Sequence, residues 1–383
     1  MNKLFPTQEI GSLSKPAWRV KGCRGLSLTK REIKEALEWG RKLGIENLDK
    51  LAKLLSEKDS IHKRQVVLEW SARYAIKLLE FAGLDIVFDG EQWRSEMYEH
   101  VARSVRGFSF LGMVKSFDFR YYNKAVCVGK PRHVQDIYLE EFLFTRKNTD
   151  KIVKIPFTGP YTLACWTFNE YYEREQAKKT GNLKQRKLEA KQAFLLDLVK
   201  NVVRPEIRKL IDAGARWIQI DEPAATTFQS DEEMTLFVDS FNETVKGFNS
   251  IFSLHNCYSN YKILAKYAGK LRNCNQLALE FANRDDGQIG RRERSGYCDL
   301  QLFEKYGFRG NYGVGVIDVH TDLVESPKLV RERILYAAKM VGDPSRIYVS
   351  TDCGLRTKTW KTSYEKLRNM VLGAEMARRR VSM

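Results

Sequence analysis

Residues 218–223 read Ile-Gln-Ile-Asp-Glu-Pro, an apolar β-rich run that leads directly into two acidic side chains and a proline. The run predicts a buried strand at residues 217–220. Asp221 then stands at the carboxyl end of that strand, where parallel α/β proteins place functional side chains. A helix cap in the strand–helix loop is the alternative role for such a carboxylate, and the motif alone leaves both roles open.

The same strand-then-helix pattern recurs along the chain. Strands are expected at residues 8–11, 84–88, 152–157, 217–220, 251–254, 277–281, 313–319 and 347–350. Segments with helical periodicity are residues 30–56, 62–82, 190–213, 231–248, 261–269, 326–340 and 364–380. Strands that alternate with helices indicate an α/β fold with a parallel sheet, and the expected number of strands matches a closed (β/α)8 TIM barrel better than an open sheet.

Two stretches interrupt the repeat and are expected as loop insertions at the catalytic rim. Residues 94–146 predict a strand-and-loop excursion with β-rich runs at 107–114 and 125–128, and residues 170–187 form a charged insert. An N-terminal helical segment lies between the first two strands. No Pro/Gly/Ser-rich linker divides the chain, so residues 1–383 are expected to form a single catalytic domain.

The composition is that of a globular protein, with 43% hydrophobic and 30% charged residues. The sequence has neither a signal-like N-terminus nor an apolar stretch of membrane-spanning length, so we expect a cytoplasmic protein without a membrane partner. Seven scattered cysteines argue against a disulfide framework. Lys and Arg exceed Asp and Glu by 65 to 48, but no nucleic-acid motif accompanies this charge, and no nucleic-acid partner is expected.

Ionisable and sulfur-bearing side chains gather where the expected strands end. In chain order these side chains are Ser12, Glu91, Thr158, Asp221 with Glu222, His255 with Cys257, Glu280, Asp318 with His320, and Cys353. The carboxyl ends of barrel strands meet on one face, and barrel enzymes place their active sites there. The sequence therefore predicts an active site at this face.

His255 and Cys257 stand two residues apart, so an extended strand turns both side chains the same way and lets them share one ion. Such a pair alone is more often accidental. Glu280 and Cys353 follow two other strands, and four nitrogen, sulfur and oxygen ligands suit tetrahedral zinc better than magnesium or calcium. A buried free cysteine and a glutamate paired with an arginine are the alternatives.

Short motifs follow one another in order along the whole chain. They are Ile10-Gly-Ser12, Asp89-Gly-Glu91, Thr158-Gly-Pro-Tyr-Thr162 with Trp166, Ile220-Asp-Glu-Pro-Ala224, His255-Asn-Cys257, Glu280, Asp318-Val-His320 and Asp352-Cys-Gly-Leu355. Each motif is short, but the ordered set is highly specific. The set resembles the catalytic C-terminal barrel of the cobalamin-independent methionine synthase family.

The resemblance implies zinc-dependent transfer of a methyl group to the thiol of L-homocysteine, which yields methionine. The implied zinc ligands are His255, Cys257, Glu280 and Cys353. The implied contacts of homocysteine are Glu91 and Asp221 for its amino group, and Ser12 with the backbone N–H groups of Ile10 and Gly11 for its carboxylate. Two acids that bind an ammonium distinguish an amino acid from a plain thiol such as coenzyme M, the alternative acceptor.

The sequence departs from the family on the side of the methyl donor. Full-length members carry a second, N-terminal barrel that helps to hold folate, and we expect this chain to lack one. The family's folate-contacting Arg-Cys pair corresponds to Arg120-Tyr121, and a family glutamate corresponds to Thr227, although Trp166 is retained. These differences imply a short, core methionine synthase whose donor is a methylcorrinoid protein, methylcobalamin or another non-folate compound. Methyltetrahydrofolate is the alternative.

The resemblance also gives Asp318 and His320 a catalytic role, in which the imidazole donates a proton to the departing pterin nitrogen. A cobalt leaving group does not need that proton. With a corrinoid donor, His320 would instead orient Asp318 or a water molecule. A purely structural imidazole is the further alternative.

Overall fold

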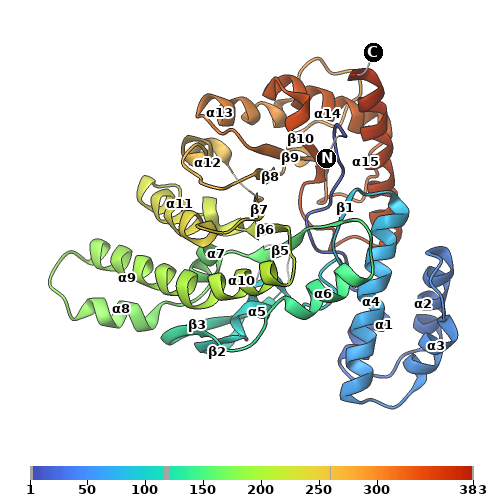
Figure 1. Cartoon of the computed structure of the whole chain (residues 1–383), viewed down its shortest axis with the longest axis horizontal. Helices are drawn as coiled ribbons and strands as arrows, with labels where there is room; N and C mark the ends of the chain where they lie inside the picture. The colour runs from blue at the N-terminus through green and yellow to red at the C-terminus, as the bar shows by residue number, and fades with distance from the viewer. Residues whose placement is uncertain (1–2, 116–120, 259, 382–383) are drawn as a thin grey trace.

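A parallel sheet forms the centre of the computed structural model, which describes residues 3–115, 121–258 and 260–381 (Figure 1). Six strands lie side by side in chain order, and each is parallel to its neighbours. They are β5 (Ile155–Thr158), β6 (Trp217–Asp221), β7 (Ile251–Asn256), β8 (Gln276–Leu279), β9 (Asn311–Ile317) and β10 (Ile347–Thr351). Their carboxyl ends therefore meet at one edge, as expected of an α/β fold.

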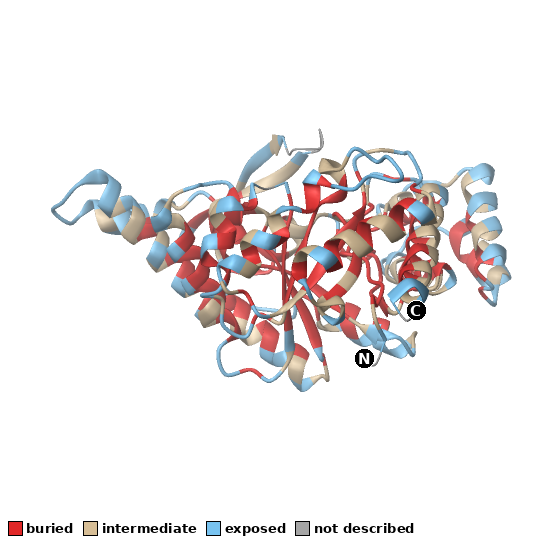
Figure 2. Cartoon of the chain, turned by 90° about the horizontal axis from the view of Figure 1, so that it is seen from above, coloured by how far each residue is buried: buried red, intermediate tan, exposed pale blue. Residues whose placement is uncertain are grey.

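Helices connect these strands and cover the outside of the sheet (Figure 1). After β5 come α7 (Pro160–Cys165), α8 (Glu170–Ala177), α9 (Leu183–Leu198) and α10 (Arg204–Asp212), and the later helices are α11 (Asp231–Val245), α12 (Tyr261–Ala268), α13 (Asp299–Lys305), α14 (Pro327–Val341) and α15 (Trp360–Val381). Buried positions concentrate on the strands and on the helix faces turned toward them (Figure 2). No helix in the described part of the chain is long and apolar enough to cross a membrane.

The expected first strand, residues 8–11, does not form, so that prediction is wrong. Thr7 makes an isolated bridge to Val349 of β10, and Gln8 makes one to Ile86 of β1 (Ile86–Val87). The segment divides its backbone hydrogen bonds between two neighbours, and no regular ladder forms on either side. β1 in turn pairs with β4 (Ile152–Val153) in a separate two-stranded sheet.

Two predicted strands extend two residues too far, because backbone amides at their ends bond to side chains. The N–H of Glu280 donates to the Tyr261 hydroxyl (2.9 Å), which ends β8 at Leu279. The N–H of Asp318 donates to the Glu325 carboxylate (2.7 Å), which ends β9 at Ile317. Both acidic side chains thus stand in loops just beyond their strands.

The N-terminal helical segment is more broken than expected. Helix α1 (Ala17–Cys23) comes first, and the predicted helix at 30–56 is two helices, α2 (Lys30–Lys42) and α3 (Leu48–Ser56). Gly44 and Asn47 between them adopt positive φ angles of 65° and 59°, which a helix cannot accommodate. Helix α4 (Ile61–Ala82) confirms the expected helix at 62–82.

The expected insertion at residues 94–146 contains helices as well as strands. β2 (Val105–Lys115) and β3 (Tyr121–His133) form an antiparallel hairpin between α5 (Met97–Ala102) and α6 (Leu139–Lys147). The charged insert at 170–187 is also helical, because it contains α8 and the start of α9. In Figure 1 the hairpin lies beside the α8–α9 pair.

Polar side chains cross-link the strands inside the sheet. The buried Lys154 ammonium donates to the Glu9 carbonyl (2.8 Å) and to the Gln219 side-chain oxygen (2.6 Å). The Gln219 amide donates in turn to the Ile10 carbonyl (2.7 Å) and to the Asp221 carboxylate (2.8 Å). A buried cation in this position is satisfied by hydrogen bonds, and it ties the N-terminal segment to β6 just below the strand end.

Candidate active site and metal centre

A cavity of about 660 Å³ opens at the carboxyl ends of the strands. Most of the residues predicted for the site line it: Ile10, Ser12, Glu91, Trp166, Asp221, His255, Cys257, His320 and Cys353. Lining residues not predicted to act there include Glu96, Met97, Tyr122, Thr226, Tyr258, Arg356 and Lys358. Arg120 lies outside the described residues. The topology thus brings together side chains from segments far apart in sequence.

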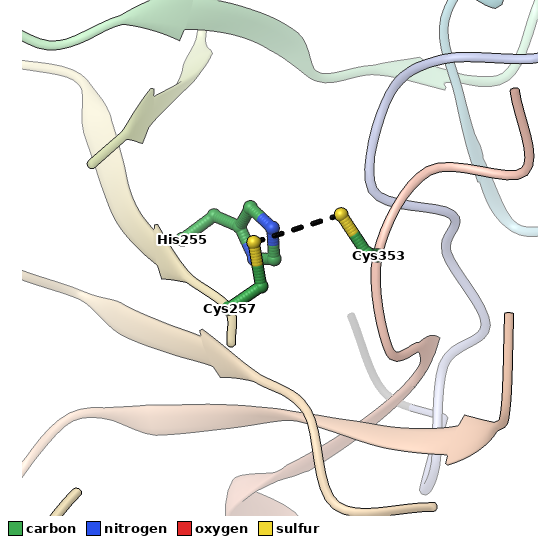
Figure 3. A group of neighbouring side chains, drawn as sticks. All are labelled: His255, Cys257 and Cys353. Atoms are coloured by element: carbon green, nitrogen blue, oxygen red, sulfur yellow. Dashed lines mark hydrogen bonds between the residues drawn. The ribbon is translucent and has the colours of Figure 1, made fainter. Parts of the chain in front are cut away.

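Three potential metal ligands converge at this cavity (Figure 3). One ligand atom each from His255, Cys257 and Cys353 lies within 4.8 Å of the other two, and the two sulfur atoms are 3.7 Å apart. His255 is the second-last residue of β7, Cys257 follows that strand, and Cys353 follows β10. The expectation that an extended His-x-Cys pair faces one point agrees with this arrangement.

Two buried atoms of the candidate ligands lack hydrogen-bond partners among the described residues, and they test whether a metal fits. They are Nε2 of His255 and Oε2 of Glu280. Nδ1 of His255 bonds to the Ala278 carbonyl (2.9 Å), an arrangement that leaves the Nε2 lone pair for a ligand bond. Because unsatisfied buried polar atoms are costly, imidazole, thiol and carboxylate groups oriented in this way fit a zinc ion.

The pKa values of the two thiols shift in opposite directions. The hydrogen bond with Cys257 lowers the pKa of the Cys353 thiol well below its ordinary value, and His255 acts in the same direction. The same hydrogen bond, together with burial, raises the pKa of Cys257 well above its ordinary value. The pair therefore provides one thiolate, the form of cysteine that binds metals.

Glu280 does not join the group of three within 4.8 Å, and its carboxylate lies nearest to His320, with Oε2 and Nε2 3.8 Å apart. The Tyr258 hydroxyl lies 3.3 Å from Nδ1 of the same imidazole. The nearby Glu280 carboxylate is the main cause that raises the pKa of His320. Asp318 does not line the cavity. Its carboxylate accepts the backbone N–H of His320 (2.8 Å) and so shapes the loop after β9.

Asp352 ties the loop of Glu280 to the loop of Cys353. Its buried carboxylate accepts the N–H groups of Phe281 (2.9 Å), Ala282 (2.9 Å) and Asn283 (2.7 Å). Burial raises the pKa of Asp352 to about 7, whereas these N–H groups stabilise the charged form. One side chain thus fixes the distance between two loops that carry candidate ligands.

The two acidic residues at the carboxyl end of β6 have different roles. The carboxylate of Glu222 accepts the N–H groups of Tyr161 (3.0 Å) and Thr162 (2.6 Å), which caps the N-terminus of α7. Asp221 instead lines the cavity, and burial raises its pKa to about 7. The helix-cap alternative for this motif therefore applies to Glu222, while Asp221 remains a candidate for substrate binding.

Glu91 reaches the cavity through a strained backbone. Its φ angle is 54°, unusual for a residue other than glycine, and its N–H donates to the Asp89 carboxylate (2.8 Å). A Cβ atom on Gly11 would lie 2.6 Å from Oε1 of Glu91. Glycine at position 11 therefore leaves the space that the Glu91 carboxylate occupies.

An aromatic wall forms the side of the cavity where the hairpin approaches. Tyr122 and Trp166 have ring centroids 5.8 Å apart, and Tyr98 packs edge-on against both. Tyr121, the residue matched to a family folate contact, is 59% exposed and does not line the cavity. Alternation along β3 explains the difference, because adjacent strand residues face opposite sides. Thr227 does line the cavity.

A thiolate, an imidazole and carboxylates at the carboxyl ends of a parallel sheet define an α/β protein with a candidate metal-dependent active site. The description of the family model that matches residues 49–376 is "Cobalamin-independent synthase, Catalytic domain". This match covers most of the chain. The chain therefore belongs to the cobalamin-independent synthase family.

Curated relatives agree with this assignment, and a solved structure shares the fold. The chain is 35% identical to the methionine synthase of Pyrococcus horikoshii over 98% of this chain and 94% of the relative. It is 37% identical to that of Thermoplasma acidophilum over 85% of this chain and 93% of the relative. The structure of a B12-independent methionine synthase from a Shewanella species in complex with selenomethionine superposes with a TM-score of 0.74 at 22% identity and covers 99% of both chains.

Gly11→Ala tests the packing under Glu91. The added methyl group would meet Oε1 of Glu91 at 2.6 Å and the Pro156 ring at 3.2 Å. We expect a loss of about 1–3 kcal/mol in the free energy of unfolding, measured by chemical denaturation. Gly129→Ala is the control, since its nearest neighbour would be 4.0 Å away. Equal stability of the two variants would contradict this account.

Asp352→Asn tests the tie between the ligand loops. An amide cannot accept from all three N–H groups, because its NH2 would face donors. We expect zinc affinity to fall roughly 10–100-fold, measured by competition with a chelator. Asp343→Asn is the matched control, because Asp343 caps a short 3-10 turn, Pro344–Arg346, outside the cavity. Unchanged affinity in Asp352→Asn would show that the tie does not position the ligands.

Proposed function

We propose that this protein transfers a methyl group to the thiol of L-homocysteine and so forms methionine. The observation that carries the proposal is the presence of three convergent metal ligands and two buried acids in one cavity. The relatives named methionine synthases, which match nearly the whole chain, support it. A thiol site and an ammonium site side by side are what a thiol-bearing amino acid requires.

We propose His255, Cys257, Glu280 and Cys353 as ligands of a zinc ion. The orphaned Nε2 of His255 and Oε2 of Glu280 support this set, although Glu280 must approach the other three ligands more closely. When bound, zinc keeps an added thiol deprotonated and nucleophilic near neutral pH. The protein's contribution is to hold one ligand from β7 and three from the loops that follow β7, β8 and β10 at one point.

The proposed contacts of the amino acid follow from the cavity walls. Glu91 and Asp221 bind the ammonium, and Ser12 with the N–H groups of Ile10 and Gly11 binds the carboxylate. Ser12 packs against Gly354, where a Cβ atom would lie 2.2 Å from its hydroxyl oxygen, so it stands next to the ligand Cys353. Coenzyme M as acceptor would leave both buried acids without an ammonium, which disfavours it.

For the donor we propose a non-folate compound, with methylcobalamin or a methylcorrinoid protein as the first candidate. Thr227 on the cavity wall, in place of the family's glutamate, supports the exclusion of a folate contact. The family's description as cobalamin-independent favours a donor without cobalt. The proposal of a corrinoid donor therefore rests only on the sequence's departures from the family on the donor side, such as Thr227. His320 would protonate a nitrogen leaving group and would orient Asp318 or a water if the leaving group is cobalt.

We further propose that the chain closes into a (β/α)8 barrel as one catalytic domain, residues 1–383. The bridges of Thr7 to β10 and of Gln8 to β1 support closure, because they join the last strand to the first through the N-terminal segment. Lys154 supports it as well, since its N–H donates to the Val87 carbonyl (3.1 Å) between β4 and β5.

Metal analysis tests the zinc site. We expect about one zinc per chain, and Cys353→Ala should lose most of the metal and at least about 100-fold in methyl transfer to homocysteine, because a thiolate ligand disappears. Cys298→Ala is the control, since that cysteine is exposed and outside the cavity. A zinc-free wild type, or full activity in Cys353→Ala, would overturn the zinc proposal.

A donor panel tests the reaction. Zinc-loaded protein is given L-homocysteine with methylcobalamin, methyltetrahydrofolate or S-methylmethionine, and methionine is measured by mass spectrometry. We expect methionine from methylcobalamin and none from methyltetrahydrofolate. The opposite result would show that methyltetrahydrofolate is the donor. Methylation of coenzyme M in preference to homocysteine would show that the proposed acceptor is wrong.

A further inference from the structure

We propose that Arg94 is a positioning residue that keeps the Glu91 carboxylate directed at the cavity. In this way it sets the preference for an amino-acid thiol over a plain thiol. The inference deepens the proposed function and rests on it, because it assigns the ammonium of the acceptor to Glu91. Arg94 itself does not line the cavity, so it acts through the residue that does.

Most of the Arg94 guanidinium is committed to buried partners. Its side chain is 1% exposed, its Nε donates to Oε1 of Glu141 (2.9 Å), and its Nη2 donates to Glu141 and to the Pro156 carbonyl (2.8 Å). The rings of Tyr138 and Phe88 lie 4.5 and 5.6 Å from its central carbon. Hydrogen bonds and ring contacts on this scale fix the guanidinium in one orientation.

The remaining nitrogen faces Glu91. Nη1 of Arg94 is buried, has no hydrogen-bond partner among the described residues, and lies 3.7 Å from Oε1 of Glu91. A Cβ atom on Gly11 would lie 2.6 Å from the same oxygen, and Glu91 lines the cavity whereas Arg94 does not. A buried donor with no other partner is a directional constraint on the nearest acceptor.

Four carboxyl groups share this region, and Arg94 offsets their charge. Burial raises the pKa of Glu141 and of Asp221 to about 7, and it raises the pKa of Asp89 well above its ordinary value. Arg94 lowers the pKa of each of these three, and Glu91 raises it. Without the guanidinium the acids would repel one another, and the Glu91 carboxylate would lose both its counter-charge and its fixed direction.

The experiment compares the binding of two ligands by calorimetry to the zinc-loaded protein. L-homocysteine carries the amino group, and 4-sulfanylbutanoate is the same molecule without it. In Arg94→Met we expect binding of homocysteine to weaken at least about tenfold, the scale of one charge-assisted contact, while binding of 4-sulfanylbutanoate stays within about twofold of the wild type. Arg94→Lys keeps a cation without the fork and should recover part of the preference.

Arg294→Met is the matched control for loss of a buried arginine. Arg294 is equally buried and pairs with Asp285 (2.7 Å) and Glu332 (2.8 Å) away from the cavity. Its removal should lower the unfolding temperature without changing the ratio of the two affinities. If Arg94→Met does not fold, a double-mutant cycle of Arg94→Lys with Glu91→Gln replaces it, and Arg94→Lys should have no further effect on the ratio when Glu91 is Gln.

The outcomes separate this inference from the proposed function. An unchanged affinity ratio in Arg94→Met, or equal weakening of both ligands, would overturn the positioning role. An effect of Arg94→Lys that persists in the Glu91→Gln background would overturn it too. Failure of the wild type to form methionine in the donor assays would overturn the proposed function. Those assays measure turnover, so their result is independent of the two affinities measured by calorimetry.

Discussion

The sulfur atoms of Cys257 and Cys353 lie 3.7 Å apart although 96 residues separate them in the chain. This convergence depends on two strands that end at the same edge of the sheet and on loops that do not move apart. Asp352 supplies the second condition, because three backbone N–H groups of the neighbouring loop bind its carboxylate. Gly315 leaves the necessary space, since a Cβ atom there would lie 2.0 Å from that carboxylate.

The cavity also brings two kinds of chemistry together. Thiol and imidazole groups gather at the ends of β7 and β10, whereas Glu91 and Asp221 stand on neighbouring walls. The aromatic wall of Tyr122 and Trp166 bounds the side near the hairpin.

The positions of the site residues could be predicted from the sequence because each follows a short apolar run. Pattern alone placed Asp221, His255 and Cys353 at strand ends, and the order of the motifs supplied the family. The pattern failed where backbone groups bond to side chains or to two partners, as at Thr7 and Glu280. It also could not find Tyr122 or Arg94, since their roles depend on which face of the hairpin meets the cavity and on a buried contact with Glu141.

The bridge between Thr7 and Val349 joins the two ends of the chain. On a ribosome the segment around Thr7 is made early, but it cannot pair with this neighbour until synthesis has passed Val349. Cys353 belongs to the same late stretch as Val349. The bridge to β10 and the last of the candidate metal ligands therefore become available at the same stage of synthesis. A chain that stops before Val349 lacks both the strand contact and Cys353.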